Sequence, residues 1–551
     1  MSKNLIYLLV ILLFSIIGMR ALFHPGLFTA HDIWHQVIRF YYFSQSVNDG
    51  HLPPNWIYNL AKGFGYPLFF FSYHLPWLMG ILILKMDLNF FDTIKILFFL
   101  SYLISGISMY FFMLNLVKDR TAALTSSILY LWLPYHFMVI FVGASMGVAF
   151  IFAFLPIVFW GITLISTDNE LGVPILSLGL SGIILSHFMH LIFLLPIILI
   201  FSAWALANNP RKTVILKRFF AGIFLAVIIS GFYLIPAYYY SKLTKVYTES
   251  GYSELYKRNF LNLTQLLYSK WGYGPIINNA KSSEISFQLG IAQWLVLIII
   301  IIMVLTKKLS KSYTHLSLNL LFGFIVYVFL ILDYSKFVWA FLVKFISLDF
   351  PFRLILPAAF ISTIFAGIIL VNVQKRLRII LTIILILISL YTNRNHTKVN
   401  QYTIYPIKTY LDSELSMTTN TFNEYLPLKA DPKLLDKPWK EAFGMDLSFS
   451  NTKKGTDFIT FEIKTPYTQK VSIGQFYFPG QLLYVDNRLA QFDTDTKGLI
   501  ATKLTTGPHT ILIKYQETPL VKFSKLLSLI GILAILQLLT KQINIRKKAD
   551  S

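Results

Sequence analysis

Long apolar stretches recur along most of the chain, with short polar segments between them. A helix needs about 20 mostly apolar residues to cross the hydrocarbon core of a bilayer, and these stretches approach that length. The pattern predicts a polytopic α-helical membrane protein with about twelve spans. The expected spans lie near residues 4–23, 93–116, 121–138, 148–166, 173–187, 190–207, 219–238, 289–306, 316–332, 354–373, 379–391 and 521–540.

One further apolar stretch, residues 67–84, does not fit a straight span. It reads PLFFFSYHLPWLMGILIL, and its Pro67, Pro76 and Gly80 favour a broken element at the membrane surface. Its placement matters because a crossing here would reverse the orientation of every later span. The distribution of basic residues decides between the two orientations.

Basic residues gather in the short loops, and such loops face the cytoplasm under the positive-inside rule. If 67–84 does not cross, all of these loops lie on the same side as Lys3 and the C-terminal tail. We therefore expect cytoplasmic N- and C-termini, an outer loop at 24–92 in which 67–84 is embedded, and another outer loop at 239–288. The loop residues concerned are Lys118, Arg120, Arg211, Lys212, Lys217, Arg218, Lys307, Lys308, Lys311, Lys375, Arg376 and Arg378.

Near the C-terminus the chain changes character, because Asn, Thr, Asp and Lys become frequent. Segments at 458–463, 471–478, 482–487 and 510–515 alternate apolar and polar residues, and turn residues separate them. Period-two alternation predicts strands, so we expect a small extracytoplasmic β-sandwich. The expected domains are a transmembrane domain at 1–391, the β-rich domain at 392–520, and a final span with a basic cytoplasmic tail at 521–551.

The composition agrees with a membrane protein, since 56% of the 551 residues are hydrophobic and 13% are charged. Soluble domains carry about 25% charged residues. The net charge of +22 does not indicate a nucleic-acid partner, because the basic residues lie in short runs between apolar segments. Cysteine is absent, which excludes disulfides and thiolate chemistry.

Polar residues are dense just after the first expected span. His31, Asp32, His35 and Arg39 fall close together, and they share one face if residues 32–43 are helical. A carboxylate, an imidazole and a guanidinium at the membrane surface can together deprotonate a hydroxyl and bind a phosphate. The alternative is that Asp32 caps the helix and its polar neighbours face solvent.

The same loop continues with GHLPPNW and KGFGYPLFFF, and this combination resembles a known family. An acidic residue soon after the first helix, followed by these motifs, is similar to the GT-C superfamily of membrane glycosyltransferases. Within it, the chain most resembles the bacterial membrane proteins called YfhO-like or 6-pyruvoyl-tetrahydropterin synthase-related. Weaker similarity continues at 232–240, 350–353, 424–427 and 476–487. The match is carried by Gly50, Pro53, Trp56, Gly63, Gly65, Pro67 and Leu68.

The resemblance implies transfer of a sugar from a polyprenyl-phosphate-linked donor to an envelope lipid or glycan acceptor on the outer face. It implies that Asp32 is the general base or orients the acceptor. We expect His31, His35, Arg39 and Trp56 to contact the substrate. Such a site needs a base for the acceptor hydroxyl and cations for the departing phosphate. No cofactor is expected, and a divalent metal is left open.

Three residues later in the chain are further substrate-binding candidates. Arg353 precedes an expected span, where a guanidinium can bind phosphate or extend to lipid headgroups. His187 and His190 lie one helical turn apart at an expected helix end. We expect these histidines to cap a helix or line the site rather than to bind a metal.

The chain departs from the family in the second expected outer loop, FVGASMGVAFIFAFLP. Relatives often carry an Arg-Gly pair and a Glu there, whereas this loop contains no acid. Glu249, Glu254 or Asp349 would have to supply it, or the activity is altered or lost.

The leading hypothesis is therefore an envelope glycosyltransferase. A transporter or flippase for lipid-linked glycans is the main rival, which charged residues inside the membrane or two matching halves would favour. A non-catalytic envelope assembly protein of the same fold is the third reading, and the missing acid of the second loop keeps it open.

Overall fold

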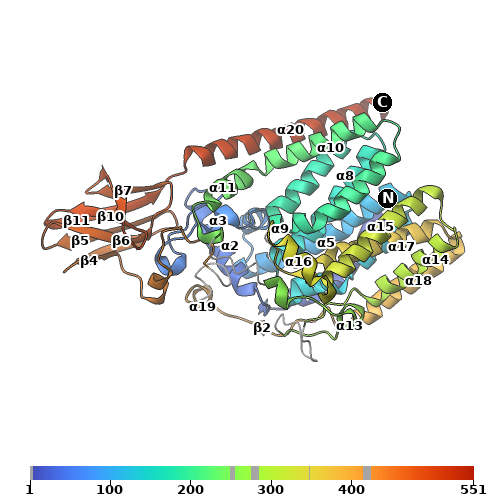
Figure 1. Ribbon diagram of the computed structural model, residues 1–551, viewed down its shortest axis with the longest axis horizontal. Helices are drawn as coiled ribbons and strands as arrows, with labels where there is room; N and C mark the ends of the chain where they lie inside the picture. The colour runs from blue at the N-terminus through green and yellow to red at the C-terminus, as the bar shows by residue number, and fades with distance from the viewer. Residues whose placement is uncertain (1–3, 248–254, 275–284, 347, 414–422, 551) are drawn as a thin grey trace.

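The computed structural model describes residues 4–247, 255–274, 285–346, 348–413 and 423–550. Long helices form one body, and a β-sandwich projects from one end of it (Figure 1). Both chain termini lie at the opposite end of the helical body. We call these two ends the sandwich end and the basic end.

The first elements, up to residue 166, are α1 (Leu5–Gly18), η1 (Arg20–Phe23), β1 (Leu27–Phe28), α2 (Ile33–Asn48), η2 (Ala61–Gly63), α3 (Leu68–Phe71), α4 (Leu75–Leu84), α5 (Phe90–Val117), α6 (Arg120–Leu131), α7 (Pro134–Phe137), η3 (Met138–Val142) and α8 (Met146–Ser166). The later helices are α9 (Gly172–Ala207), α10 (Lys212–Ile229), α11 (Gly231–Ser241), η4 (Lys245–Tyr247), η5 (Tyr256–Arg258), α13 (Leu263–Leu267), α14 (Ile291–Leu305), α15 (Lys311–Ile331), η6 (Asp333–Ser335), α16 (Lys336–Leu342), η7 (Pro351–Leu354), α17 (Ile355–Val371), α18 (Lys375–Thr392), α19 (Ile407–Leu411), η9 (Pro432–Asp436) and α20 (Pro519–Asp550). The later strands are β2 (Tyr402–Thr403), β3 (Ala442–Phe443), β4 (Ser448–Lys454), β5 (Phe458–Thr465), β6 (Gln469–Phe476), β7 (Gln481–Val485), β8 (Arg488–Ala490), β9 (Asp493–Thr494), β10 (Leu499–Leu504) and β11 (Gly507–Tyr515).

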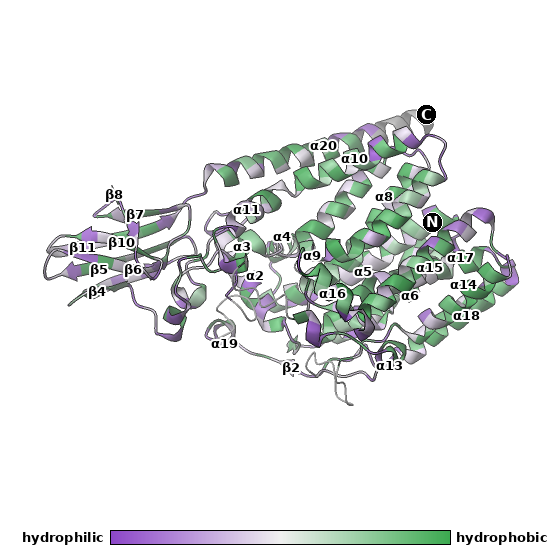
Figure 2. Ribbon diagram, viewed as in Figure 1, coloured by the Kyte–Doolittle hydropathy of each residue, from purple (hydrophilic) through white to green (hydrophobic). Residues whose placement is uncertain are grey.

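Six helices of the described chain are long and apolar enough to cross a membrane, namely α5, α8, α9, α15, η7 with α17, and most of α20. Two bent pairs, α6 with residues 134–142 and α10 with α11, raise this number to eight. Hydrophobic residues cover the long helices, whereas hydrophilic residues gather on the strands and at several helix ends (Figure 2). These features indicate a multi-pass membrane protein, as the sequence predicts.

The longest internal helix, α9, reverses its direction. The chain just before it contacts the chain just after it, because Asp168 pairs with Arg211 at 2.6 Å and the Ser166 carbonyl accepts from Asn209 at 2.7 Å. A straight helix of 36 residues would separate these ends by about 54 Å. The reversal occurs at His187, whose φ of −167° and ψ of 86° are not helical. Two antiparallel helical segments therefore lie where the sequence predicts two spans.

The apolar stretch 67–84 is broken, as its prolines predict. Its two helices, α3 and α4, contain four and ten residues, and Ser72 between them is extended. At 1.5 Å per residue α4 is about 15 Å long, which is half the thickness of a bilayer core. The His74 amide donates to the Leu185 carbonyl at 3.1 Å. This stretch therefore packs on the reversal of α9.

Several basic loops meet at the basic end. Arg120 donates to the side chain of Asn4 at 3.0 Å, so the loop between α5 and α6 lies beside the N-terminal segment. Arg378, in the first turn of α18, pairs with Asp119 of the loop between α5 and α6. The loop between α14 and α15 joins this group through a hydrogen bond between Ser310 and Asn372. The sequence groups these loops on one side of the membrane, and they gather at one end of the fold.

The β-sandwich contains two antiparallel sheets, with strand orders β3-β6-β10-β9 and β4-β5-β11-β7-β8. Alternate residues of the central strands are buried, such as Ile459, Phe461 and Ile463 of β5 and Ile511 and Ile513 of β11. The strands β5, β6, β7 and β11 coincide with the four strand segments that the sequence predicts, and β5 and β11 show the period-two burial.

The residues before the sandwich have a different arrangement from the one predicted. Strands of the two sheets begin only at Ala442, whereas the expected β-rich domain begins at 392. Residues 393–413, which we call the strap, lie on the helical body instead. Asn393 donates to the Trp132 carbonyl at 2.8 Å, and β2 pairs with β1 near the start of the chain. Long-range contacts of this kind leave no periodic pattern in the sequence.

The sandwich docks on residues 49–67, which we call the seat. The Gly63 carbonyl accepts from Gln475 at 2.6 Å and from the Lys454 ammonium at 2.5 Å. The Phe476 amide donates to the Phe64 carbonyl at 2.8 Å. The glycine-rich motif that carries the family resemblance thus forms the joint between the helical body and the sandwich.

Lys454 gives this joint a pH dependence. Burial lowers the pKa of Lys454 from 10.5 to about 7, and the nearby Glu441 offsets only part of the effect. In the unfolded chain the group keeps its ordinary pKa, so between these two values the unfolded state binds the extra proton. The free energy of unfolding therefore rises as the pH increases from about 7 towards 10.5. We expect the stability difference between the natural protein and Lys454→Met to grow in favour of the natural protein from pH 6 to pH 9.

Thermal unfolding of both proteins in one detergent, measured across that pH range, checks this expectation. Lys464→Met is the matched control, because Lys464 is an exposed lysine on β5 and should give a constant difference. Parallel pH profiles for the natural protein and Lys454→Met would contradict the assigned cause.

Candidate functional site

The site begins where α2 starts, at the sandwich end. The backbone amides of His31 and Asp32 donate to the carbonyls of Val142 and Gly143 at 2.9 and 3.0 Å. Gln36, one turn later, donates to the Ala144 carbonyl at 2.9 Å. The two loops that the sequence places on the outer face are therefore joined beside Asp32.

The second of these loops is held in an unusual backbone conformation. Met138–Val142 form a π-helical turn, and Ala144 has a positive φ of 48°. π-Helical turns are rare and occur often at functional sites. The loop contains no acidic residue, so it contributes backbone groups and the N-terminus of α8 to the site. The positive end of that helix dipole favours an anion.

Asp32 does not act as a side-chain cap of α2, because it makes no capping hydrogen bond to that helix. Its carboxylate instead lies within electrostatic range of Tyr73. The Tyr73 hydroxyl donates to Gln36 at 2.6 Å and also hydrogen-bonds Arg39. Tyr73 therefore connects Asp32 with Arg39. Tyr73 carries no distinguishing signal in the sequence, because a tyrosine in an apolar stretch resembles an interfacial aromatic residue.

His187 and His190 face each other at the reversal of α9, with ring centroids 4.3 Å apart. The charges of both Arg39 and Arg353 reach His187, and the charge of Arg353 also reaches His190. The structure thus brings together five residues that the sequence selects from three separate segments: Asp32, Arg39, His187, His190 and Arg353. We call this group, with Tyr73, the polar cluster.

Arg353 pairs with Asp349 at 2.6 Å, and both side chains are largely buried. Its guanidinium also lies 5.0 Å from the ring of Phe350. Asp349 is one of the three acids that could replace the missing acid of the second loop, and it is paired with Arg353. The other two, Glu249 and Glu254, lie outside the described residues.

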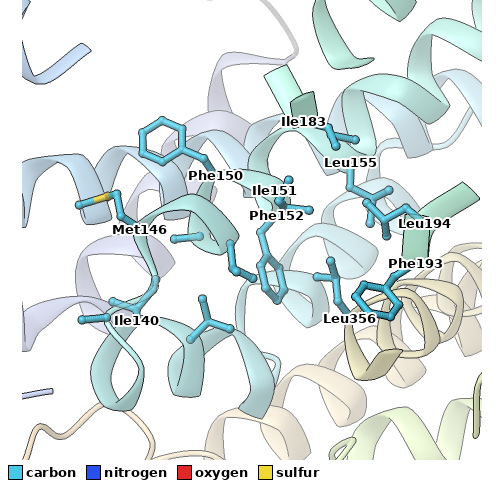
Figure 3. Close-up of a cluster of buried hydrophobic side chains, with 14 of the residues drawn as sticks. Ile140, Met146, Phe150, Ile151, Phe152, Leu155, Ile183, Phe193, Leu194 and Leu356 are labelled. Atoms are coloured by element: carbon cyan, nitrogen blue, oxygen red, sulfur yellow. The ribbon is translucent and has the colours of Figure 1, made fainter. Parts of the chain in front are cut away.

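An apolar cluster fixes the elements that carry these side chains (Figure 3). Phe152 of α8, Phe193 of α9 and Leu356 of α17 all belong to it and are buried. Protein interiors are close-packed and resist displacement. His190 and Arg353 each lie three residues before a member of this cluster, so the core holds their backbones in place.

Some polar atoms of the cluster have no partner in the part of the chain that the structure describes. Both ring nitrogens of His190 and the Nε of Arg39 are buried without a hydrogen bond. An unmet buried donor costs about 1–3 kcal/mol, which bound ligand oxygens would recover. The cluster is therefore chemically suited to hold an anion beside the Asp32 carboxylate.

The other predicted substrate contacts have different surroundings. His35 is buried, and burial together with the nearby Arg39 lowers its pKa to about 3, which keeps the imidazole neutral. His31 is exposed. Trp56 is 1% exposed and stacks on Phe478 of the sandwich at 5.4 Å. Trp56 is thus part of the joint with the sandwich, and the structure does not bring it to the polar cluster.

Within the described ranges, no group of three or more His, Cys, Asp or Glu side chains could hold a metal ion. The charge of Arg353 reaches both His187 and His190.

The fold and the polar cluster define a class of protein, a multi-pass helical chain with a β-sandwich and a charged cluster at the end of the bundle nearest that sandwich. The chain matches no family model and no curated protein. The residues of the cluster therefore carry the functional argument.

Proposed function

We propose that this protein is a membrane glycosyltransferase of the GT-C type. It transfers a sugar from a polyprenyl-phosphate-linked donor to an envelope lipid or glycan acceptor on the outer face of the membrane. The observation that carries the proposal is a chain of neighbouring groups at one end of the helix bundle. The charges of Asp32 and Arg39 both reach Tyr73, and the charges of Arg39 and Arg353 both reach His187.

Each group has a chemical role in such a transfer. The acceptor hydroxyl gives its proton to Asp32 as its oxygen bonds to the anomeric carbon of the sugar. The bond from that carbon to the phosphate oxygen breaks, and its electron pair leaves on the polyprenyl phosphate. Arg39, Arg353 and the N-terminus of α8 stabilise the departing phosphate, since guanidiniums bind phosphate oxygens in pairs. Tyr73 and Gln36 orient Arg39.

The proposal includes an orientation and a span count. We place about twelve spans across the membrane, with both termini and the basic end in the cytoplasm and the sandwich outside. The gathering of basic loops at one end of the fold supports this orientation.

Reporter fusions test the orientation. We expect fusions at Lys118 and at Lys212 to read cytoplasmic, and a fusion in the exposed turn at Asn487 of the sandwich to read extracytoplasmic. The charge distribution is the physical reason, because basic loops are retained on the cytoplasmic side. The opposite reading at both lysines would show that residues 67–84 cross the membrane.

A second candidate is a non-catalytic envelope assembly protein of the same fold. The observation that favours it is the acid-free loop beside Asp32, where the contacts come from backbone carbonyls of Val142, Gly143 and Ala144. Purified full-length protein in lipid nanodiscs, supplied with a panel of labelled polyprenyl-phosphate sugars and with envelope extract, separates the two. Label transferred into lipid or glycan supports the enzyme. No transfer, together with unchanged glycolipids and wall polymers in cells that lack the protein, supports the alternative.

A further inference from the structure

A cationic cavity lies away from the polar cluster, at the sandwich end of α1. Its volume is about 630 Å³, which is within the range of ligand pockets. One wall is η1 and the residues after it, with Arg20, Phe23 and His24, and the other wall is the strap, with Lys398 and Tyr402.

The two walls are tied together on both sides of the cavity. The Tyr402 hydroxyl donates to the Ala21 carbonyl at 2.9 Å, and its ring stacks on His24 with centroids 3.8 Å apart. The β1–β2 pair continues this joint. The cavity is thus a built feature of the fold, formed by segments nearly 400 positions apart in the chain.

The charges in the cavity have one sign. The described residues that line it include Arg20 and Lys398 but no aspartate or glutamate. Within the described part of the chain neither Arg20 nor Lys398 forms an ion pair, whereas the nearby Lys95 is paired with Asp92 at 2.8 Å. The charge of Arg20 also reaches Tyr402. Two cations of one cavity, a guanidinium and an ammonium, match the oxygens of a phosphate group.

The surroundings indicate that a lipid carries this phosphate. Phe23 at the rim is 60% exposed, and Leu13, Ile16 and Ile17 are exposed along α1. This apolar surface begins at the cavity and follows α1, a short apolar helix, so acyl chains can lie on it while the headgroup enters the cavity.

We propose that this cavity binds the phosphate headgroup of an anionic membrane lipid. The bound lipid braces the strap, whose Gln401 carbonyl accepts from the Thr29 amide at 2.9 Å, three residues before Asp32. The inference does not depend on the proposed sugar transfer, since it concerns other residues and binding alone.

Native mass spectrometry of the full-length protein tests it by counting retained lipids. Phosphatidylglycerol should stay bound, diacylglycerol with the same chains but no phosphate should not, and inorganic phosphate should not displace the phosphatidylglycerol. The double variant Arg20→Gln/Lys398→Gln should lose about tenfold or more in affinity. The charge-preserving double variant Arg20→Lys/Lys398→Arg should retain most of the affinity for phosphatidylglycerol. Its binding would show that substitutions at these two positions leave the protein folded.

Arg394→Gln is the matched control. Arg394 lies on the same strap, but its guanidinium lies 4.2 Å from the ring of Tyr391 and does not line the cavity. Retention should therefore be unchanged in this variant. Equal retention by the double variant and the natural protein, or equal retention of diacylglycerol, would overturn the proposal. Displacement by inorganic phosphate would assign the cavity to a free anion and would also overturn it.

Discussion

Asp32→Asn is expected to abolish sugar transfer, with a loss of at least about 100-fold, the lower end of the contribution of a general base. Asparagine has nearly the same size as aspartate, and the Asp32 side chain makes no capping hydrogen bond to α2, so α2 should be retained. Asparagine cannot accept the proton of the acceptor hydroxyl. The measurement is label transfer from a polyprenyl-phosphate sugar by the purified full-length protein in nanodiscs, at matched protein amounts.

The matched control for this prediction is Asp92→Asn. Asp92 lies in the first turn of α5, is about half exposed and pairs with Lys95. Its replacement should leave transfer unchanged and elution from a sizing column identical to that of Asp32→Asn. Full transfer by Asp32→Asn would remove the residue from the role of base, even if the protein is an enzyme.

Much of the helical body can be predicted from the sequence because spans and strands leave periodic or continuous apolar patterns. The two halves of α9 and the break at Ser72 follow from such patterns, and so do β5 and β11. The start of the sandwich cannot be predicted in this way. Residues 393–413 are polar like the sandwich, but they are held on the helical body by individual contacts such as that of Asn393 with the Trp132 carbonyl.

The candidate site is predictable only in part, for a related reason. Charged residues such as Asp32, Arg39 and Arg353 are conspicuous in an apolar chain, because burying a charge near lipid is costly. Aromatic residues carry no such signal. Tyr73 joins the cluster and Trp56 lies outside it, although both occur in aromatic-rich stretches of the same loop. Only the contacts of Tyr73 with Gln36 and of Trp56 with Phe478 distinguish them.

Gly65→Ala is expected to undock the sandwich, and this is the largest stability effect that we predict. A Cβ at Gly65 would lie 2.2 Å from the Cζ2 of Trp56, another residue of the seat, whose ring stacks on Phe478 of the sandwich. Gly65 also has a φ of +89°, which side chains rarely adopt. Overpacking costs about 1–3 kcal/mol and the backbone strain about 1–2 kcal/mol more. We expect limited proteolysis to cleave Gly65→Ala between the sandwich and the helical body, under conditions in which the natural protein resists cleavage.

Gly50→Ala separates the two causes. Gly50 belongs to the same seat and has a similar φ of +95°, but nothing lies within 4 Å of its Cβ position. Gly50→Ala should therefore lose only the backbone contribution to stability, about 1–2 kcal/mol. The sandwich should stay docked in this variant. If Gly65→Ala resists proteolysis as well as Gly50→Ala does, the seat does not hold the sandwich. If it is cleaved while residues 4–247 stay protected, the glycine motif is a joint between domains. Its presence in a chain then indicates a docked sandwich rather than catalysis.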